Sequence, residues 1–599
     1  MITVLVGHRG TGKTALLRRI ARYRPEAILH DLDECIERGE GLSIAEIFRT
    51  RGEAAFRELE RDHLARLMTR CSGAEPVFIA VGAGFPGPLP PGVHCLWVRR
   101  DSDRDGRIFL DRPRLDPALD PLEEYRRRFA EREPRYRAWA DDVLTLGEGF
   151  IDEDPGEVRF FAGREAPGPA AITLLPEHVR PDAAGRERLA AWARRHRARG
   201  VGTFELRDDL LSPGQLRAAL DSLPAEQLLY SFRMPPAAPP RPWPAGLRFD
   251  WDISLGRCPH GAPAILSLHA RTRGETLGGA AQRLEAASSG GENLKLAVEV
   301  GDFAELLAGH RWALGDPERR AFLPGSEDGR WAWYRLAHGR RQPLAFVREG
   351  AGSAPDQPTL AAWLRYPGDA AAFAAVLGDP VRHSWSPAAH HEFFARRGLP
   401  VLAVRVTEAD WQAGAFEILA ALGLRYAAVT APLKAHAFRA AAVVAPPAGE
   451  LGAVNTLYGA ESGARWHGTN TDLEGLRAAL DSLALPDALA VWGGGGMLSV
   501  LRACLPGATF VAARSGRRTA GPPLEQPRAV VWAGGDRTGT SPPDAWRPEQ
   551  VVDLDYRDSA PGRAWALRVG AHHVSGATLF HEQARRQQAW WDSVEKTVS

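Results

Sequence analysis

Short apolar runs alternate with longer stretches rich in Ala, Arg and Glu along most of the chain. The first run covers residues 2–6, and similar runs recur at 203–207, 228–232, 264–269 and 294–300. Each run has the length of a buried strand, and the stretches between runs have the length of helices. Repeated alternation of strand and helix predicts an α/β fold with parallel sheets.

Changes in composition divide the chain into three blocks. Residues 1–150 end in an Arg/Glu-rich helical stretch, and the Pro/Gly-rich segment GREAPGPA predicts a linker over 151–170. The alternating runs of residues 171–366 predict a parallel sheet or a (β/α)8 barrel. The third block carries a Gly-rich turn, VWGGGGML, and we expect a first lobe, a Rossmann-like domain and a helix that returns to the first lobe, over 372–470, 471–575 and 576–599.

Composition and charge indicate which kinds of partner the chain binds. The chain of 599 residues has 75 Lys and Arg against 74 Asp and Glu, so its net charge is +1 and nothing favours nucleic acid or an anionic membrane. The five cysteines show no disulfide or metal-binding spacing. With no leader and no apolar run of membrane length, we expect a cytoplasmic protein with small-molecule partners. A homodimer is left open.

A nucleotide-binding pattern lies at the start of the chain. The loop GHRGTGKT follows an apolar run and precedes a helical pattern, which is the context of a phosphate-binding P-loop. Gly7, Gly10 and Gly12 let backbone N–H groups face phosphate, Lys13 neutralises the β and γ oxygens, and Thr14 supplies a hydroxyl for Mg²⁺. The alternative is a chance match, which the context disfavours. The loop therefore predicts ATP and Mg²⁺ as cofactors.

The segment after the P-loop indicates the acceptor. Residues 28–60, ILHDLDECIERGEGLSIAEIFRTRGEAAFRELE, carry D-x-D, G-x-S-I-x-E-I-F and G-E-x-x-F-R. This series resembles the shikimate kinases. The resemblance implies that Asp31 helps to hold Mg²⁺, that Asp33 binds the acceptor hydroxyls and takes a proton, and that Arg57 binds the acceptor carboxylate.

Later motifs of the first block fit the same family. RPRL resembles the mobile lid, which implies that Arg112 closes on the phosphates. REPRY resembles the second carboxylate-binding segment, with Arg132 on the same carboxylate as Arg57. Gly82 stands in the family's three-glycine turn on the substrate side. Ala83 replaces the middle glycine, and we expect it to impair the fit of the acceptor.

Two candidate catalytic residues, a histidine and a lysine, lie on apolar runs of the second block. His269 ends the run ILSLH, and Lys295 lies inside LKLAVEV between two leucines. Catalytic residues of a (β/α)8 barrel lie at the carboxyl ends of its strands, so both side chains are expected to face one cavity. Burial lowers the pKa of an amine and makes it a better nucleophile toward a carbonyl. The alternative, a snorkelling lysine and a satisfied core histidine, fits the pattern alone equally well.

The motifs around these residues resemble type I 3-dehydroquinate dehydratases. FELRDD, SFR and SAPDQ fit that family, with Asp356 in place of a glycine. The resemblance implies that Lys295 forms a Schiff base with 3-dehydroquinate and that His269 moves the adjacent proton. It also implies substrate-binding roles for Glu205, Arg207, Arg233, Arg335, Ser353 and Gln357.

One departure from this family lies directly after Arg233. The family has an acidic residue and two glycines there, and this chain has MPPAAPPRPWP. Loss of that carboxylate leaves His269 without a partner that tunes its basicity. We expect Asp250 or Asp252 on the next strand to substitute, with reduced activity.

The third block resembles shikimate dehydrogenases. Its opening, GDPVRHSWSPAAHH, carries the two serines that bind the substrate carboxylate in that family, although S-x-S before proline is by itself more often a helix cap. VTAPLK and GTNTDLEG supply Lys434 and Asp472, a pair that can pass a proton to the C3 oxygen while hydride arrives from a nicotinamide. The resemblance implies substrate-binding roles for Ser384, Ser386, Thr430, Asn455, Tyr556 and Gln583. Ala428 replaces an asparagine of the family motif, which removes one expected contact.

The second Gly-rich turn predicts a dinucleotide. Gly493, Gly495 and Gly496 allow close approach of a pyrophosphate between a strand and a helix. Arg514 follows the next strand, where an NAD enzyme has an acidic residue, so NADP(H) is favoured. Residues 515–545 are short for the usual strand–helix units, and we expect a trimmed cofactor domain.

The three resemblances match consecutive reactions. Loss of water converts 3-dehydroquinate into 3-dehydroshikimate, reduction gives shikimate, and phosphorylation gives shikimate 3-phosphate. The order of the blocks is similar to the last three domains of the fungal pentafunctional enzyme of aromatic biosynthesis, which predicts a trifunctional enzyme. The alternatives are a non-catalytic regulator, like the fungal quinate-pathway repressors, and an enzyme with one inactive domain. The reactive groups that favour the enzyme are Lys13, Asp31, His269, Lys295, Lys434 and Asp472.

Overall fold

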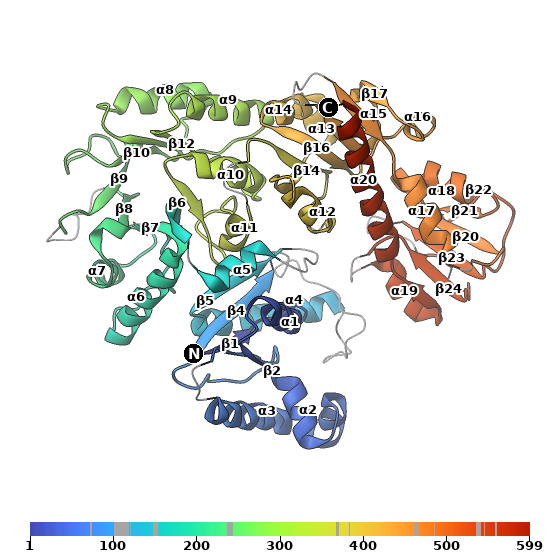
Figure 1. The fold of residues 1–599 in the computed structure, drawn as a ribbon, viewed down its shortest axis with the longest axis horizontal. Helices are drawn as coiled ribbons and strands as arrows, with labels where there is room; N and C mark the ends of the chain where they lie inside the picture. Colours follow the sequence, from blue (N-terminus) through green and yellow to red (C-terminus); the bar gives the residue numbers. More distant parts are fainter. Residues whose placement is uncertain are drawn as a thin grey trace. The chain divides into compact units, whose positions relative to one another are not determined.

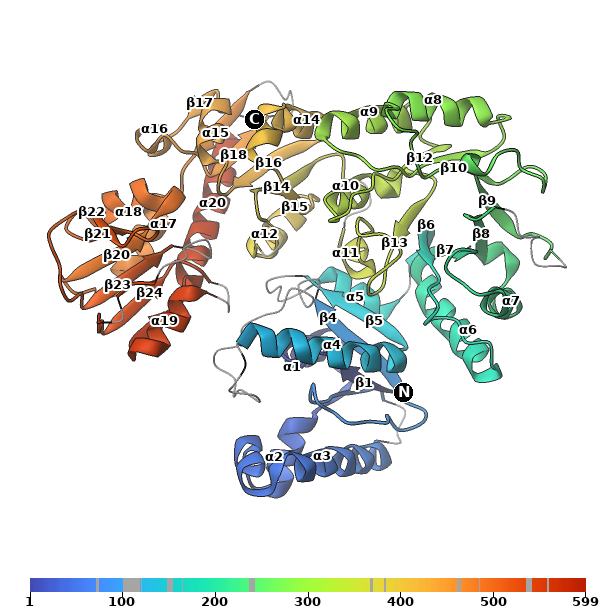
Figure 2. The ribbon, with the colours of Figure 1, turned by 180° about the vertical axis from the view of Figure 1, so that it is seen from behind.

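The computed structural model describes residues 1–71, 75–100, 119, 121–147, 154–163, 165–235, 243–366, 370–381, 384–460, 465–483, 485–534, 541–543, 545–556 and 560–598. Contacts group most of the described residues before 367 into one compact unit and those from 370 onward into another. Each unit consists of β-sheets with helices packed on them (Figure 1; Figure 2 gives the view from behind). The predicted α/β class is confirmed.

The first sheet has the P-loop strand at its centre. Its five parallel strands follow the order β2-β3-β1-β4-β5, with bounds Ile28–Asp31, Val77–Ala80, Ile2–Val6, His94–Arg100 and Asp142–Leu146. The helices of this part are α1 (Lys13–Tyr23), α2 (Leu32–Glu40), α3 (Ile44–Arg70) and α4 (Pro121–Trp139). Helix α3 begins within the G-x-S-I-x-E motif because Ser43 and Glu46 form a capping box there.

The stretch from 151 to 170, expected to be a linker, contains regular structure. Helix α5 (Pro155–Ala162) begins after Asp154, whose side chain accepts a hydrogen bond from the Gly156 N–H, and strand β6 (Glu165–Thr173) follows. The pairing of β6 with β7 (Arg199–Arg207) shifts in register between Glu165 and Ala170, where the prolines stand. Proline and glycine therefore mark an irregular part of a strand here.

Eight parallel strands form the second sheet, a nearly closed barrel. Their order is β12-β11-β10-β9-β8-β7-β6-β13, so β12 and β13 stand at its two ends. The further strands are β8 (Leu228–Phe232), β9 (Arg248–Asp252), β10 (Ile265–Leu268), β11 (Asn293–Leu296), β12 (Arg320–Phe322) and β13 (Ala345–Val347). The outer helices are α6 (Ala183–Ala198), α7 (Pro213–Ser222), α8 (Leu277–Ala287), α9 (Phe303–Leu314), α10 (Ala332–His338) and α11 (Leu360–Arg365). Because the strands are parallel, their carboxyl ends share one mouth.

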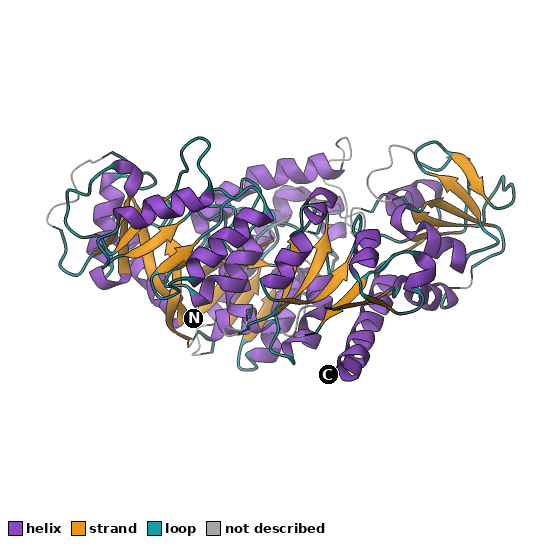
Figure 3. Cartoon of the chain, turned by 90° about the horizontal axis from the view of Figure 1, so that it is seen from above, coloured by secondary structure: helices purple, strands orange, loops and turns teal. Residues whose placement is uncertain are grey.

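The second unit contains two six-stranded sheets. The first has the order β15-β14-β16-β18-β19-β17, with bounds Val401–Arg405, Phe373–Gly378, Leu424–Val429, Thr456–Gly459, Trp466–Thr469 and Val443–Val444. The second has the order β22-β21-β20-β23-β24-β25, with bounds Arg517–Ala520, Thr509–Ala512, Leu489–Gly493, Ala529–Ala533, Gln550–Asp553 and His572–Val574. Figure 3 shows helices covering the strands in each part.

Nine helices of the second unit, all within the described residues, accompany its two sheets. They are α12 (Ser386–Ala395), α13 (Glu408–Gln412), α14 (Ala415–Ala421), α15 (Lys434–Ala440), α16 (Ala448–Leu451), α17 (Asp472–Asp481), α18 (Leu498–Cys504), α19 (Pro561–Val569) and α20 (Ala577–Val598). Helix α20 packs against α17 and α12, so the chain returns to the first lobe. Between β21 and β23, where every residue is described, the chain forms the antiparallel strand β22 and no helix, which agrees with a trimmed cofactor domain. None of the helices in the described ranges is long and apolar enough to cross a membrane.

Candidate active sites

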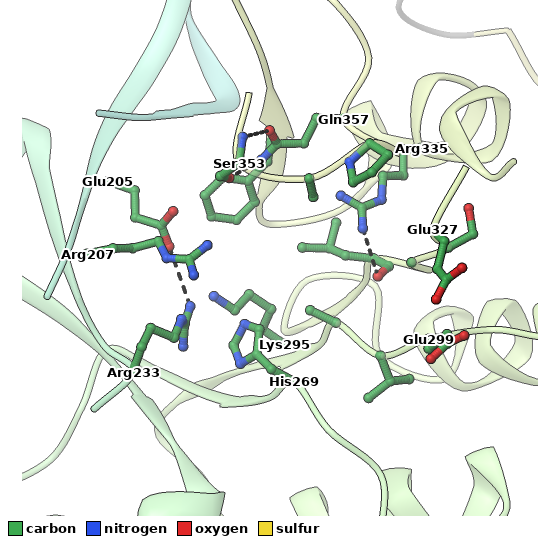
Figure 4. A pocket seen from close by; sticks show the side chains of 18 residues that line it. Glu205, Arg207, Arg233, His269, Lys295, Glu299, Glu327, Arg335, Ser353 and Gln357 are labelled. Atoms are coloured by element: carbon green, nitrogen blue, oxygen red, sulfur yellow. Dashed lines mark hydrogen bonds and ion pairs between the residues drawn. The ribbon is translucent and has the colours of Figure 1, made fainter. Parts of the chain in front are cut away.

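The mouth of the barrel holds a cavity of about 340 Å³ (Figure 4). Its lining includes all the second-block residues singled out from the sequence, namely Glu205, Arg207, Arg233, His269, Lys295, Arg335, Ser353 and Gln357. They come from β7, β11, helix α10 and the loops after β8, β10 and β13. Closure of the parallel sheet brings these distant residues to one place, as the barrel prediction required.

Lys295 lies on β11 and is almost fully buried. Its Nζ donates a hydrogen bond to Asp250 Oδ2, which also accepts one from Arg233 Nη2 at 2.9 Å. Burial lowers the pKa of Lys295, and the charge of Arg233 acts in the same direction, while Asp250 and Glu205 oppose the change. The side chain is therefore a buried amine inside a cavity, and the snorkelling alternative does not apply.

His269 lines the same cavity at the end of β10. Its Nδ1 lies 2.7 Å from Asp252 Oδ2, and Asp252 is itself held by hydrogen bonds from Ser254. Burial lowers the pKa of His269 to about 4, helped by nearby cations and opposed by the hydrogen bond to Asp252. A neutral imidazole that donates Nδ1–H to Asp252 keeps the lone pair of Nε2 for a proton.

Asp252 is thus the one of the two candidate aspartates that contacts His269, while Asp250 contacts Lys295 and Arg233. Residues 236–242, in the segment where the family has its acidic residue, lie outside the described residues. The expectation that an aspartate of the next strand serves His269 agrees with this geometry.

The other side of the cavity is formed by the loop after β13 and by α10 (Figure 4). Gln357 Nε2 donates to Ser353 Oγ at 3.0 Å, and the Ser353 N–H donates to Gln357 Oε1 at 3.0 Å. Arg335 is buried and donates to the Pro324 carbonyl at 2.9 Å, and burial lowers its pKa to about 10. Several guanidinium groups thus line one cavity, which suits an anionic ligand.

Asp356, which replaces a family glycine, has a structural contact. Its carboxylate accepts hydrogen bonds from the Ser326 N–H at 2.5 Å and from the Trp331 N–H at 2.6 Å. The change therefore joins the loop after β13 to the loop after β12.

The backbone of the P-loop has the shape that phosphate binding requires. Gly7, Gly10 and Gly12 have φ angles of 152°, 76° and 94°. A Cβ at Gly7 would collide with the carbonyl oxygen of Val98, so glycine is needed at this position. The loop then leads into α1, whose first residue is Lys13.

Side chains beside the P-loop provide ligands of the type expected for a nucleotide and its metal. Lys13 Nζ donates to the Gly7 carbonyl at 2.8 Å, which holds the amine over the loop. Thr14 Oγ1 donates to Asp31 Oδ2 at 2.7 Å. A hydroxyl and a carboxylate oxygen therefore stand together, and Mg²⁺ prefers oxygen ligands of this kind.

The three charged residues predicted to bind the acceptor lie on three different helices of the first block. Asp33 lies on α2, Arg57 on α3 and Arg132 on α4. Burial raises the pKa of Asp33, and neighbouring Asp31 adds to this. Burial lowers the pKa of Arg132, and the cations Arg128 and Arg57 add to that effect. Two guanidinium groups close enough to repel each other are suited to share one carboxylate.

The lysine and the aspartate predicted as an acid–base pair lie together in the second unit. Lys434 Nζ donates to Asp472 Oδ2 at 2.7 Å. Asp472 Oδ1 accepts hydrogen bonds from Asn455 Nδ2 at 2.8 Å and from Gln583 Nε2. The residues come from α15, α17, the loop before β18 and α20, which explains why α20 must return to this lobe.

The remaining predicted ligands of this lobe lie at element ends. The Ser386 N–H donates to Ser384 Oγ at 3.2 Å just before α12, whose N-cap residue is Trp385, so Ser384 does not cap this helix. Thr430 directly follows β16. Tyr556 Oη accepts a hydrogen bond from the Trp385 N–H at 3.2 Å, and the two rings lie 4.5 Å apart.

The chain matches two family descriptions, Shikimate kinase over residues 9–87 and Shikimate dehydrogenase substrate binding domain over residues 376–457. A shikimate kinase of Corynebacterium glutamicum is 34% identical over 170 residues, which are 26% of this chain and 91% of that protein. A shikimate dehydrogenase (NADP(+)) of an Anaeromyxobacter species is 32% identical over 252 residues, which are 36% of this chain and 89% of that protein. The chain belongs to the shikimate kinase and shikimate dehydrogenase families.

A solved structure is also similar to part of the chain. It is shikimate 5-dehydrogenase from Thermus thermophilus in complex with NADP(H) and shikimate, with 28% identity and a TM-score of 0.32. The match covers 37% of this chain and 93% of that one.

In the shikimate dehydrogenase part, two of the three glycines predicted for the cofactor loop have positive φ angles. Gly493 and Gly495 have φ angles of 89° and 44°, and a Cβ on Gly493 would lie 2.7 Å from Gly534 Cα. A Cβ at Gly496 would meet nothing within 4 Å, so this glycine leaves open space beside the loop. Arg514 is exposed between β21 and β22, where a phosphate can reach it.

In the shikimate kinase part, one buried acid escaped the sequence reasoning. Glu60 Oε2 accepts a hydrogen bond from Arg57 Nη1 at 2.7 Å, and burial raises the pKa of Glu60. The available signal was spacing, because residues three apart on a helix share a face. Arg112, predicted for the lid, lies outside the described residues.

In the turn Gly82-Ala83-Gly84, other side chains lie close to the backbone of the two glycines on either side of Ala83. A Cβ on Gly82 would lie 2.5 Å from Glu60 Oε1, and one on Gly84 would overlap the Arg57 guanidinium. The charged side chains of Glu60 and Arg57 therefore lie against the two outer glycines, and the expected effect of Ala83 on the fit of the acceptor stays a prediction.

Proposed function

We propose that the chain is a trifunctional enzyme that converts 3-dehydroquinate into shikimate 3-phosphate. Family membership supports shikimate kinase and shikimate dehydrogenase activities, which we assign to residues 1–150 and 372–599. The barrel, residues 171–366, is proposed as a type I 3-dehydroquinate dehydratase, and 151–170 connects it to the kinase. The observation that carries this last proposal is the buried Lys295 beside a neutral His269 in a cavity lined by arginines.

In the proposed dehydratase, the neutral amine of Lys295 attacks the ketone of 3-dehydroquinate, and water leaves as the Schiff base forms. Nε2 of His269 then takes a proton from the neighbouring carbon, and the electron pair moves into the protonated imine. The imidazolium returns this proton to the departing hydroxyl, which leaves as water. Hydrolysis of the imine releases 3-dehydroshikimate and restores Lys295.

Substrate binding in this cavity is assigned to the surrounding polar side chains. Arg335, Arg207 and Arg233 supply positive charge for the carboxylate and hydroxyl groups of the ring. Glu205, Ser353 and Gln357 supply hydrogen-bonding groups for the hydroxyls.

In the kinase, ATP supplies the phosphoryl group and Mg²⁺ offsets its charge. Lys13 and the P-loop glycines bind the phosphates, and Thr14 and Asp31 hold the metal. Asp33 binds the acceptor hydroxyl and takes its proton, while Arg57 and Arg132 bind the shikimate carboxylate, and Arg112 is proposed to close on the phosphates. These roles remain proposals for the individual residues.

In the dehydrogenase, NADPH supplies the hydride. Lys434 and Asp472 deliver a proton to the carbonyl oxygen as it becomes a hydroxyl. Their partners Asn455 and Gln583 fix the pair, and Ser384, Ser386, Thr430 and Tyr556 are assigned to substrate binding. The glycines of the cofactor loop receive the pyrophosphate, and Arg514 pairs with the 2′-phosphate of NADP. A homodimer and a cytoplasmic location stay predictions.

The regulator alternative has less support. A ligand sensor needs to bind these compounds but does not need a depressed lysine pKa or a Lys434–Asp472 proton pair. Both features are present, so the enzyme is favoured.

A single coupled assay tests the proposal. Purified protein is given 3-dehydroquinate, NADPH and Mg·ATP, and the products are identified by mass spectrometry, with shikimate 3-phosphate expected. Lys434→Met should stop the sequence at 3-dehydroshikimate, and Lys13→Met should stop it at shikimate. If the chain consumes added 3-dehydroshikimate but leaves 3-dehydroquinate untouched, the dehydratase assignment is wrong. If none of the three reactions occurs, the regulator takes its place.

A further inference from the structure

The loop after β13 carries two proposed ligands of the dehydratase, Ser353 and Gln357, and it begins beside the kinase. Its second residue, Glu349, is buried. Glu349 Oε1 lies 2.6 Å from His196 Nε2, and Glu349 Oε2 accepts a hydrogen bond from Trp192 Nε1 at 3.2 Å. Both partners lie on α6, so side chains tie the start of the loop to this helix, in addition to the backbone bridge between Arg348 and Thr359.

His196 connects this contact to the edge strand of the kinase sheet. Its Nδ1 lies 2.9 Å from the Trp192 carbonyl oxygen, so each ring nitrogen lies within hydrogen-bond distance of an oxygen atom. Ligand atoms of His196, Glu349 and Asp142 all lie within 4.8 Å of one another, and Asp142 is the first residue of β5 in the kinase. A buried imidazole therefore lies close to both a carboxylate of the kinase part and a carboxylate of the barrel.

Asp142 is fixed by further contacts from the barrel. Arg195 Nε and Arg199 Nη2 donate to Asp142 Oδ2 at 3.1 and 3.0 Å. Burial alone would raise the pKa of Asp142, but Arg199 and His94 hold it well below its ordinary value. The carboxylate therefore stays charged and keeps its place.

Three such ligand groups also raise the question of a metal, which the surroundings disfavour. Two guanidinium groups already neutralise Asp142, and they would repel a divalent cation. The adjoining cavity is small, with a volume of about 30 Å³, so it leaves no room for a larger ligand. The cluster therefore serves to join elements rather than to hold a ligand.

The far end of the loop is joined to the kinase side as well. The loop leads into α11, where Arg365 Nε donates to Asp154 Oδ1 at 2.9 Å at the start of α5. Helix α5 in turn reaches α1 of the kinase, because Arg19 pairs with Glu157 through two hydrogen bonds of 2.8 and 2.9 Å. The segment with Ser353 and Gln357 is thus anchored at both ends to elements that pack on the kinase.

We propose that the kinase domain is a structural part of the dehydratase site: Asp142, acting through His196 and Glu349, positions the loop that carries Ser353 and Gln357. This inference rests on the proposed dehydratase function. Asp142, His196 and Glu349 are positioning residues, since none of their contacts reaches the substrate cavity. A change on the kinase edge strand should therefore alter dehydratase binding without touching the kinase active site.

The test uses the full chain with Glu349→Gln and Asp142→Asn. Each should raise the KM for 3-dehydroquinate by about five- to tenfold with kcat within about twofold, as expected when roughly 1–1.4 kcal/mol of positioning is lost. Shikimate kinase and dehydrogenase constants should stay within about twofold in Glu349→Gln. Glu285→Gln is the control, because Glu285 on α8, like Glu349, accepts a hydrogen bond from a tryptophan, Trp312, and contacts a basic side chain, here Arg320 of β12, away from this loop. It should leave the dehydratase unchanged.

Hydrogen exchange of the peptide 349–358 makes the test independent of activity. Faster exchange is expected in both Glu349→Gln and Asp142→Asn, and no change is expected in Glu285→Gln. If Asp142→Asn disturbs the whole fold, Glu349→Gln is still compared with Glu285→Gln. Unchanged exchange of this peptide in Glu349→Gln overturns the inference, whereas a wild-type chain without dehydratase activity overturns the proposed function instead.

Discussion

Replacing Asp252 by asparagine isolates the electrostatic support of the proposed base. Asn keeps an oxygen that can accept the Nδ1–H of His269 but removes the negative charge 2.7 Å away. Hydrogen bonds to charged groups contribute about 1.5–3 kcal/mol, and this is lost when the ring becomes an imidazolium in the reaction. At 1.4 kcal/mol for each factor of ten, kcat of the dehydratase should fall about 10- to 100-fold. KM should change little, because Asp252 does not line the cavity.

The pH dependence of the dehydratase rate in Asp252→Asn should shift in a defined direction. Asp252 raises the pKa of His269, which is about 4, so its removal lowers that pKa further. The base then stays unprotonated to lower pH, and any acid limb set by His269 moves to lower pH, while the plateau falls. Asp252→Glu restores the charge and should recover part of the rate. A plateau within about twofold of wild type, or a limb that moves to higher pH, would refute the role given to Asp252.

Other substitutions test the remaining sites. Gly84→Ala should raise the kinase KM for shikimate more than about tenfold by displacing a carboxylate-binding guanidinium, and Ala83→Gly should change it less than about twofold; the opposite order would contradict the placement of the turn. Arg514→Ala should raise the KM for NADPH about tenfold and leave that for shikimate unchanged, because one charged contact to the 2′-phosphate is lost; equal effects on NADH would contradict it. Burial lowers the pKa of His390 to about 4, below its unfolded value near 6.5. Between pH 6.5 and pH 4 the unfolded chain therefore binds more protons than the folded chain, so the contribution of His390 to stability falls as pH drops. From pH 7 to 5 this amounts to about 2 kcal/mol, and urea unfolding of His390→Gln should show a correspondingly flatter pH dependence of the second unit.

The sequence predicted much of the barrel site because polar residues follow short apolar runs. His269 ends its run and Lys295 lies within one, and a parallel barrel brings such positions to one mouth. The choice between Asp250 and Asp252 could not be predicted, because the two residues are two positions apart on β9 and share one face of the strand. Only the side-chain geometry shows that Asp252 contacts His269 and that Asp250 contacts Lys295.

Contacts between segments that are distant in the chain could not be predicted from the sequence. His196 and Glu349 are 153 residues apart, and nothing in either local pattern indicates that they meet. Helix α5 was not predicted, because its short apolar pattern lies beside a Pro/Gly-rich segment. Its start depends on the capping hydrogen bond of Asp154 and on the pairing of Asp154 with Arg365, which is distant in sequence. Glu60 was missed since its partner Arg57 had been assigned to the substrate alone.

The central claim is that the barrel forms a Schiff base on Lys295. The most direct measurement adds borohydride to the protein with 3-dehydroquinate and locates the trapped adduct by peptide mass spectrometry. A mass increase is expected on the peptide that contains Lys295, and it should be absent without substrate and absent in Lys295→Met. Full retention of dehydratase activity in Lys295→Met, or no adduct on that lysine in an active wild-type chain, would contradict it.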